Sequence, residues 1–501
     1  MLHKTVLVRH PSAITKSRRK IQNMKKILFV GSEVMPFAAT GGLGDVLGSL
    51  PSEIKKEMGE DSDIRVIMPM YSNIGEQWLQ QMEKVAEFEV SLSWRKLYCG
   101  INKIEKDGVV YYFVDNQYYF YRQNMYGEYD DGERFAFFCR AVLEAMNVLD
   151  YFPDVLHAND WHTALCPVYL RTYYLNDQRY QKVKSVFTIH NIEYQGKFDF
   201  NIVNDVFDLS DYDRQILEYE GGINLVKAAV VCADKVTTVS PTYANEILYP
   251  EHSHGLYHVL NLYSDKLCGI LNGIDYDYYN PSSEELAQKF TWRSPKRKAI
   301  NKNALQEEIG LPKRDDVPML AVISRLASHK GLDLVEEKLY NIVSENDVQV
   351  VVLGKGEKRY EEFFSRLQEN FPDKVSALMM YDRDLAKRIY AAADIFVMPS
   401  LSEPCGLAQM IASRYGAIPV VRETGGLYDS IKPYSEDGDK ISGNGFTFSH
   451  YNSDALKGAI LDAVNLWNDE ERRNRFVSKI MRTDFSWKNS AKQYLRMYDT
   501  I

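Results

Sequence analysis

A six-residue pattern, T-G-G-L-x-D, occurs twice in this chain, once in each half. The first copy begins at Thr40 and the second at Thr424. Each copy follows a strand-like apolar run and opens a segment with helical spacing. Paired glycines there leave backbone N–H groups bare at a helix start, which favours an anion such as phosphate. A single Gly-Gly turn is usually only a tight turn, but two copies suggest two similar α/β halves that face one anionic ligand.

Strand-like and helix-like segments alternate through both halves, which is typical of parallel βαβ units. In the first half, we expect strands at 26–30, 64–70, 109–114, 154–157, 185–190 and 236–240, with helices at 43–58 and 134–149. In the second half, we expect strands at 319–324, 348–353, 395–399 and 416–421, with helices at 332–344, 361–370 and 384–393. The predicted class is α/β, with two Rossmann-like, doubly wound parallel sheets and a ligand site in the cleft between them.

Turn signals at Asn272-Gly273 and Asn280-Pro281 place the boundary between the halves near residues 262–280. We therefore expect a first domain at 24–267, a second at 268–480 and a C-terminal helix within 481–501. Residues 1–23 form a basic extension with six Lys or Arg, no acidic residue and no apolar core of a secretory signal. This extension is interpreted as a disordered tail or as sequence ahead of a natural start at Met24. An organelle transit peptide is the alternative.

Composition excludes several classes of protein. A net charge of −9, from 60 basic and 69 acidic side chains, argues against a general nucleic-acid binder, so an anionic small ligand needs a local basic site. No apolar run reaches the ~18 residues of a membrane span. The six cysteines are scattered without a C-x-x-C pair, which favours a reducing cytoplasm. The D-x-D pairs lack nearby histidines, so no metal site is predicted.

Charged side chains in the second half lie where predicted strands end. Arg325 and Lys330 follow the strand at 319–324, where a guanidinium and an ammonium can neutralise a diphosphate leaving group. Glu403 follows the strand at 395–399 and precedes a helical segment. Its carboxylate would converge on a ligand together with the backbone N–H groups of the helix start, although a helix-capping glutamate is the plainer interpretation.

Two polar residues of the first half have a similar setting. His190 ends the strand at 185–190, and Asp160 lies just past the strand at 154–157. Together they place one imidazole and one carboxylate at neighbouring strand ends of one sheet. This is a suitable place for a polar substrate, but it is not a catalytic triad.

Several motifs in order make the chain, from Lys26 onward, resemble the bacterial glycogen synthases and plant starch synthases of glycosyltransferase family 5. They are S-E-x-x-P-F, T-G-G-L-G-D-V, H-A-N-D-W-H-T, T-I-H-N-I-E-Y-Q-G, V-T-T-V-S-P-T-Y-A, L-N-G-I-D, S-R-L-A-S-H-K-G-L-D, S-E-P-C-G-L-A-Q and R-E-T-G-G-L-Y-D. The resemblance implies the GT-B fold and transfer of glucose from ADP-glucose to the non-reducing end of an α-1,4-glucan, glycogen or a maltooligosaccharide. It also implies retention of the anomeric configuration, no metal and no other cofactor.

The resemblance further implies roles for individual residues. Arg325 and Lys330 would hold the diphosphate, His190 would contact the transferred glucose at its 6-hydroxyl edge, and Glu403 would bind sugar hydroxyls. Tyr381 would stack on the base. The implied catalytic set is His190, Glu403, Arg325, Lys330 and Asp160. The implied substrate-binding set is Thr40, Gly41, Gly42, Asp45, Asn191, Asn272, Tyr381, Cys405, Gly406 and Leu407.

One departure from the family pattern affects the first glycine loop. The family usually reads K-T-G-G-L there, whereas this chain has Ala39 in place of the lysine. A lost phosphate-facing charge costs ~1–3 kcal/mol of transition-state binding if nothing compensates it. Because Arg325 and Lys330 remain, we expect an active enzyme with altered donor affinity. Ile411 stands where many other retaining GT-B enzymes carry a second glutamate, which favours the glucan-synthase group.

Three alternatives stay open at this point. One is a synthase that uses UDP-glucose, another is a related GT-B transferase with a different acceptor, and the third is a weakly active glucan-binding protein, motivated by Ala39. We expect a cytoplasmic protein, or a plastid protein if residues 1–23 are a transit peptide. No nucleic-acid or membrane partner is expected, and the oligomeric state is left open.

Overall fold

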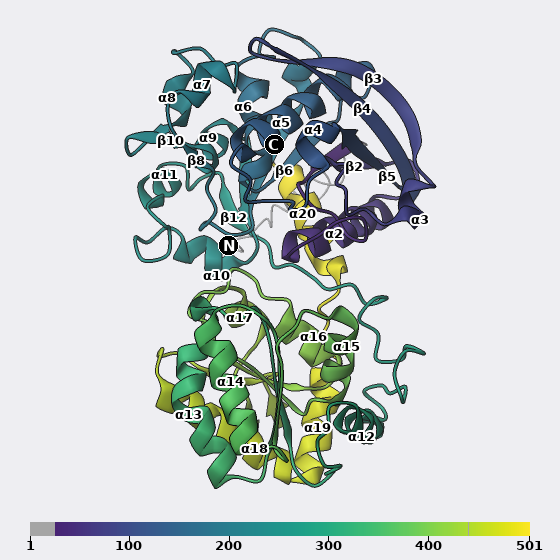
Figure 1. Ribbon diagram of the computed structural model, residues 1–501, viewed down its shortest axis with the longest axis vertical. Helices are drawn as coiled ribbons and strands as arrows, with labels where there is room; N and C mark the ends of the chain where they lie inside the picture. The colour runs from purple at the N-terminus through teal and green to yellow at the C-terminus, as the bar shows by residue number, and fades with distance from the viewer. Residues whose placement is uncertain (1–25, 439) are drawn as a thin grey trace, which may run out of the picture. The chain divides into compact units, whose positions relative to one another are not determined.

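The computed structural model describes residues 26–438 and 440–501, which form two compact units (Figure 1). Unit 1 comprises the described residues up to Thr237 together with His254–Ile270 and Trp487–Ile501. Unit 2 comprises Thr238–Ser253 and Leu271–Ser486. The units differ from the domains expected from the sequence, because 238–253 and 481–486 pack in unit 2, whereas 268–270 and the C-terminal helix, which begins at Trp487, pack in unit 1. The extension at 1–23 lies outside the described residues.

A nine-stranded sheet with the order β12-β11-β7-β6-β1-β2-β5-β4-β3 forms the centre of unit 1. Neighbouring strands from β7 to β5 are parallel, whereas β4 runs antiparallel to both β5 and β3. The strands are β1 (Lys26–Val30), β2 (Asp63–Pro69), β3 (Glu83–Leu92), β4 (Arg95–Lys106), β5 (Val109–Asp115), β6 (Val155–Asn159), β7 (Lys184–Ile189), β11 (Lys235–Thr238) and β12 (Leu267–Gly269). The sequence analysis missed β3 and β4 because charged residues interrupt them, whereas buried parallel strands are continuous apolar runs.

The helices of unit 1 cover this sheet with regularly spaced apolar residues. They include α2 (Gly42–Met58), α5 (Asp131–Val148), α6 (Leu165–Arg171), α9 (Leu225–Cys232) and α20 (Trp487–Tyr498). In α2, the buried side chains Leu43, Val46, Leu47, Leu50 and Ile54 follow the helical spacing read from the sequence. The last helix, α20, packs against α2, as Figure 1 shows in yellow beside purple.

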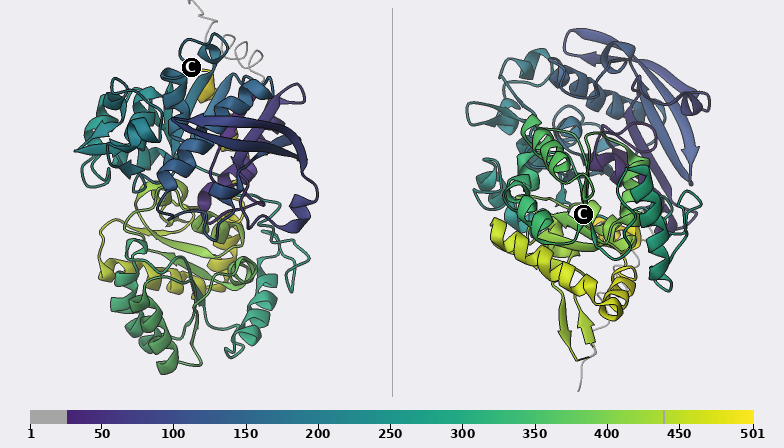
Figure 2. Two further views of the ribbon diagram at one scale, coloured as in Figure 1. Left: turned by 45° about the horizontal axis from the view of Figure 1, so that its top comes forward. Right: turned by 60° about the horizontal axis from the view of Figure 1, so that its bottom comes forward.

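Unit 2 is built on a six-stranded parallel sheet with the order β15-β14-β13-β16-β17-β20. Its strands are β13 (Met319–Ile323), β14 (Gln349–Leu353), β15 (Val375–Leu378), β16 (Ile395–Met398), β17 (Ile418–Arg422) and β20 (Phe446–Phe448). Around it pack α12 (Lys298–Glu308), α13 (Leu332–Glu345), α14 (Lys358–Asn370), α15 (Arg383–Ala392), α16 (Ala408–Arg414), α17 (Gly425–Ser430), α18 (Ser453–Asn468) and α19 (Glu470–Ile480) (Figure 2). The predicted α/β class with two doubly wound sheets is therefore confirmed. No helix within the described ranges is long and apolar enough to cross a membrane.

Candidate active site

Each sheet reverses its direction of winding at one point. In unit 1, β2 and β5 lie on one side of β1 and β6 and β7 on the other; in unit 2, β14 and β15 lie on one side of β13 and β16 and β17 on the other. In open α/β sheets, ligands bind beyond the carboxyl ends of the strands at such a switch point. Asp160 and His190 follow β6 and β7, and Arg325 and Glu403 follow β13 and β16. Each unit thus brings its predicted residues to its own switch point.

Strand register brings Asp160 and His190 together. Asn159 of β6 pairs with Thr188 of β7, so the next residues along both strands emerge at the same edge of the sheet. The N–H of His190 donates to Asp160 Oδ1 at 2.8 Å. Burial raises the pKa of Asp160 to about 7, although the backbone N–H groups of His190 and Asn191 act in the opposite direction. This carboxyl group therefore titrates near neutral pH.

Asp160 also has an unusual backbone conformation, with φ of 58° and ψ of 175°. A non-glycine residue in such a region costs of order 1–3 kcal/mol and persists only where surrounding contacts fix it. The hydrogen bond to His190 N–H and that from Asp160 N–H to Thr188 O at 2.9 Å are such contacts. Strain of this kind is common at active sites, which supports the functional interpretation of Asp160.

The imidazole of His190 is oriented by Asn159, a residue that the sequence analysis did not single out. Asn159 Nδ2 donates to the carbonyls of Val30 and His157, both at 3.1 Å, so its Oδ1 faces His190 Nε2 at 2.9 Å. We infer from this arrangement that His190 Nε2 carries the hydrogen. Burial lowers the pKa of His190 to about 3, so the ring is neutral at physiological pH. The motif H-A-N-D-W-H contains Asn159, but nothing in its spacing indicates this role.

The first glycine loop is held by Glu33, which the sequence analysis also missed. Glu33 Oε2 accepts from Thr40 N–H at 2.6 Å and from Thr40 Oγ1 at 2.8 Å, and Oε1 accepts from Gly44 N–H at 3.2 Å. The carboxylate thus occupies part of the anion position that the sequence predicted at the start of α2. Gly41 and Gly42 are exposed, and a Cβ added at Gly42 would contact nothing within 4 Å. Asp45, the predicted support of this loop, is half-buried.

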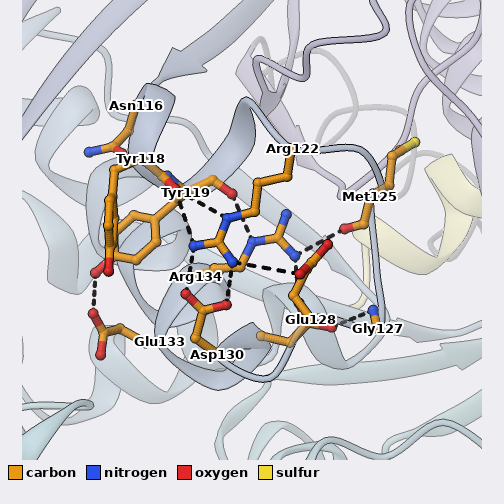
Figure 3. Close-up of polar contacts among 11 residues, drawn as sticks. Asn116, Tyr118, Tyr119, Arg122, Met125, Gly127, Glu128, Asp130, Glu133 and Arg134 are labelled. Carbon is orange, nitrogen blue, oxygen red and sulfur yellow. Dashed lines mark hydrogen bonds and ion pairs between the residues drawn. The ribbon is translucent and has the colours of Figure 1, made fainter.

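A second loop of unit 1, residues 116–130, places Tyr126 next to this strand edge. The Tyr126 hydroxyl donates to Ser32 Oγ at 2.8 Å, and its ring lies 4.5 Å from that of His162. Two arginines hold this loop (Figure 3). Arg122 forms a bidentate pair with Asp130 at 2.6 and 2.7 Å, and the buried Arg134 donates to the carbonyls of residues 119 and 125.

In unit 2, Lys330 and Glu403 form a direct ion pair. Lys330 Nζ lies 2.7 Å from Glu403 Oε2, which also accepts from Ser400 Oγ at 3.1 Å. The two loops meet because Gly331, with φ of 71°, approaches Pro399 so closely that a Cβ there would lie 2.1 Å from the Pro399 carbonyl oxygen. The structure therefore brings these two predicted catalytic residues together and explains the glycine that follows Lys330.

Two predicted residues of unit 2 are more open. The side chain of Arg325 is exposed directly beyond β13, and Tyr381 is 78% exposed in the loop between β15 and α15. An exposed guanidinium and an exposed phenol ring are available to a ligand. Arg325 follows β13, as the sequence predicted, and Tyr381 follows β15, so both lie at the carboxyl-end edge of the sheet.

The segment around Cys405 is held by residues far away in the sequence. Burial raises the pKa of the Cys405 thiol to about 12, although the Asn272 backbone N–H acts in the opposite direction. The thiol therefore stays protonated and unreactive, which leaves the backbone N–H of Cys405 as the group available to a ligand. Asn272 is buried, and its Oδ1 lacks a hydrogen-bond partner among the described residues. Gly406 adopts φ of 71°, and Leu407 leads into α16.

The second glycine loop repeats the arrangement of the first with a different glutamate. Glu246 Oε1 accepts from Thr424 Oγ1 at 3.1 Å and from Gly425 N–H at 2.9 Å. Its glycines also allow close packing, since Cβ atoms at Gly425 and Gly426 would lie 2.1 Å from the carbonyl oxygens of Glu403 and Cys405. The second copy of the motif thus shapes the loop that carries Glu403. No cluster of metal-ligating side chains occurs in the part of the chain that the structure describes.

Comparison with known proteins shows the family of this chain. Residues 26–262 match the family described as the starch synthase catalytic domain, and residues 305–481 match glycosyl transferases group 1. The chain is 45% identical to a glycogen synthase of Anoxybacillus flavithermus over 95% of this chain and 98% of that protein. It is also 45% identical to a glycogen synthase of Clostridioides difficile over 95% of this chain and 99% of that protein.

Two solved structures share the fold. The catalytic domain of starch synthase IV from Arabidopsis thaliana, bound to ADP and acarbose, superposes with a TM-score of 0.86 at 34% identity, over 95% of this chain and 99% of that one. Sucrose-phosphate synthase from Thermosynechococcus elongatus superposes with a TM-score of 0.59 at 15% identity, over 95% and 98% of the two chains. The second likeness concerns the GT-B fold alone.

Proposed function

Because this chain belongs to the glycogen and starch synthase family of glycosyltransferases and makes glucan by glycosyl transfer, we propose that its donor is ADP-glucose. We further propose that glucose passes to the non-reducing 4-hydroxyl of an α-1,4-glucan with retention of configuration. The finding that the Arabidopsis enzyme binds ADP and acarbose supports a nucleoside diphosphate and a sugar chain as ligands.

The observation that carries this proposal is the Lys330–Glu403 ion pair at the switch point of unit 2, together with the exposed Arg325, which follows the same strand, β13, as Lys330. An ammonium has three donor hydrogens, so Lys330 can keep its contact with Glu403 and still hold a phosphate oxygen. Arg325 would bind the diphosphate through its planar fork. Both cations would stabilise the charge that develops on the leaving group as the glycosidic bond breaks.

Glu403 would have two functions in this scheme. Its carboxylate accepts from Lys330 and Ser400 through one oxygen, Oε2, and Oε1 would accept hydrogen bonds from sugar hydroxyls. The close approach of the second glycine loop fixes the backbone of residues 403–405, and the backbone N–H groups of Cys405, Gly406 and Leu407 would complete the sugar site. Tyr381 would stack on the nucleotide base, and Asn272 would line the sugar side.

The unit 1 residues would serve the transferred sugar and the acceptor. Transfer through a sugar with cationic character is disfavoured by a nearby positive charge. The depressed pKa of His190 keeps its imidazole neutral, so the ring would contact the glucose without opposing that charge. Asp160, whose pKa is raised to about 7, and Asn191 would line the same side. Gly41 and Gly42 would approach the phosphates through the backbone, in a loop that the hydrogen bonds of Thr40 to Glu33 hold and that Asp45 would support.

We propose that the reaction requires no metal or other cofactor and takes place in the cytoplasm, where the six free cysteines would stay reduced. Incorporation of labelled glucose into glycogen from ADP-glucose and from UDP-glucose, measured in parallel with EDTA, tests donor and metal together. Strong transfer from ADP-glucose with EDTA present is expected, with α-anomeric product signals by NMR. Transfer from UDP-glucose alone would overturn the donor, and glucan binding without transfer would indicate a binding protein.

A further inference from the structure

A cavity of about 910 Å³ opens on unit 2 and is lined by none of the candidate active-site residues. Seven of its twelve lining residues are Lys or Arg, and none is acidic. They include Arg293, Lys296, Arg297, Lys440, Lys479 and Arg482. The lining comes from the 3₁₀ turn before α12 (Pro295–Arg297), the strand β19 (Lys440–Ser442) and α19 with the turn that follows it. We call this cavity the basic groove.

The basic groove is rich in positive charge although the chain as a whole has a net charge of −9. Arg293 and Arg482 both stack on the ring of Trp292, with their guanidinium carbons 4.5 and 5.1 Å from its centre. Burial and the charge of Arg482 lower the pKa of Lys479. Like charges are therefore held close to one another, an arrangement that an anion in the groove would relieve.

Internal acids neutralise little of this charge. Lys296 lies 2.6 Å from Glu470, but the two side chains are 71% and 62% exposed, and such exposed pairs contribute little. Arg472, on the same helix as Lys479, instead pairs with Glu436 at 2.6 Å. Arg293, Arg297 and Arg482 are exposed to solvent. Several cations whose fields overlap within a Debye length of about 10 Å at 0.1 M salt thus face the same space.

The size of the groove and the kind of cation indicate the ligand. Small-molecule sites commonly have volumes of ~300–1,000 Å³, a range that includes this cavity. Arginine forks match phosphate oxygens bidentately, and the acidic character of the whole chain disfavours a nucleic acid. We propose that the basic groove binds a dianionic phosphate ester. The ester is either a free phosphorylated metabolite or a phosphoryl group on a glucan, the latter resting on the proposed function.

The test is equilibrium binding of glucose 6-phosphate by titration calorimetry in phosphate-free buffer, with glucose as the uncharged control. The groove variant is Arg293→Gln/Arg297→Gln/Arg482→Gln. A matched control, Lys313→Gln/Lys358→Gln/Arg366→Gln, removes the same charge from exposed positions of unit 2 outside the groove. We expect saturable binding that weakens with salt, and an association constant at least about tenfold lower in the groove variant, about 1.4 kcal/mol, but unchanged in the control.

Lys330→Ala separates this site from the donor site, because loss of binding in that variant alone would assign glucose 6-phosphate to the active site and overturn the proposal. A phosphorylated glucan, compared with the same glucan after phosphatase treatment, distinguishes the two sources of the ester. Groove-dependent binding of only the phosphorylated glucan would assign the polysaccharide. If neither probe binds, or if both bind the groove variant normally, the proposal is wrong.

Unchanged unfolding temperature of the groove variant controls for misfolding, and Lys440→Gln provides a milder variant from a different element, with a smaller loss of affinity expected. Because binding is measured without donor, the result does not depend on catalysis. Failure of the groove proposal and failure of the proposed function are therefore distinguishable.

Discussion

Lys330 Nζ lies 2.7 Å from Glu403 Oε2, and the two side chains are only 18% and 9% exposed. The pair joins the loop after β13 to the loop after β16, which are the strands that flank the switch point of unit 2. Removing one member leaves the other charge without its partner in a largely buried place, which is more costly than removing both. The pair therefore fixes the two loops relative to each other and also balances the charges of its two members.

Glu403→Ala and Lys330→Ala should each lower kcat/KM for glucose transfer at least about 100-fold, because each removes a group that acts on the developing charge or on the sugar. Circular dichroism should show folded proteins. The double variant should be as inactive as the single variants. Its loss in free energy of unfolding should be smaller than the sum of the two single losses, since no unpaired charge remains.

Lys338→Ala serves as the control for this pair, since Lys338 forms an ion pair with the exposed Asp454 at 2.5 Å elsewhere in unit 2. It should keep near-normal activity. A folded Glu403 or Lys330 variant with near-normal turnover would remove that residue from the mechanism.

Glu33→Gln should raise the KM for the nucleotide sugar. The carboxylate accepts from three groups, Thr40 N–H, Thr40 Oγ1 and Gly44 N–H, whereas a carboxamide has one acceptor oxygen and turns an N–H₂ group toward donors. The loop before α2 should then loosen, and amide hydrogen exchange at residues 40–44 should accelerate. Unchanged exchange in a folded variant would show that Glu33 does not order the loop.

The sequence predicted those parts of the site that depend on short-range pattern. His190, Asp160, Arg325 and Glu403 all follow apolar strands, and the structure places each at the carboxyl end of its sheet. The roles of Asn159 and Glu33 were missed because they depend on which side-chain oxygen faces which donor, and no spacing shows that.

Long-range packing explains the other differences. Glu246 accepts a hydrogen bond from Thr424, which lies 178 residues further along the chain. Ser240 Oγ donates to the carbonyl of Pro404 at 2.6 Å, across 164 residues. These contacts draw the segment 238–253 into unit 2. A division of the chain by turn signals alone does not detect such a crossing.

Gly425→Ala should disturb Glu403 without touching its side chain. The added Cβ would lie 2.1 Å from the Glu403 carbonyl oxygen, and the residue has φ of 44°. Both a conformational cost of roughly 1–2 kcal/mol and displacement of the 403–405 backbone are expected, with loss of most activity.

Gly310→Ala isolates the conformational cost, because Gly310 has φ of 75° and nothing within 4 Å of an added Cβ. It should lower the unfolding temperature but leave activity normal. Equal activity in the two variants would show that close packing of the second glycine loop is unimportant for catalysis.

Ala39→Lys should restore a phosphate-facing charge to the first glycine loop. Position 39 is half-buried, directly before Thr40. We expect the KM for ADP-glucose to change more than kcat, since Arg325 and Lys330 already serve the leaving group. Steady-state kinetics against ADP-glucose at saturating glycogen measures this, with Ala39→Gln as the uncharged control of similar length. An unchanged KM, or an equal change in Ala39→Gln, would contradict a role for charge at this position.

Asp160→Asn should become more stable relative to the wild type as pH rises. In the folded protein, the pKa of Asp160 is raised from 3.8 to about 7 by burial, so the protonated carboxyl group stabilises the fold at low pH. That contribution is lost as pH rises from about 4 through 7. Asparagine resembles the protonated acid and keeps an acceptor for the His190 N–H, so the variant lacks this loss.

The difference in unfolding temperature, variant minus wild type, should therefore increase between pH 5 and 7 and level off above about pH 8, one unit past the folded pKa of about 7. His190, whose pKa is lowered to about 3, destabilises the fold as pH falls below about 6.5, the ordinary histidine value. Both proteins contain this histidine, so its effect cancels in the difference. Differential scanning calorimetry at several pH values measures the two temperatures. A difference that stays constant from pH 5 to 8 would show that Asp160 is ionised throughout, and its acceptor role would then involve a permanent negative charge.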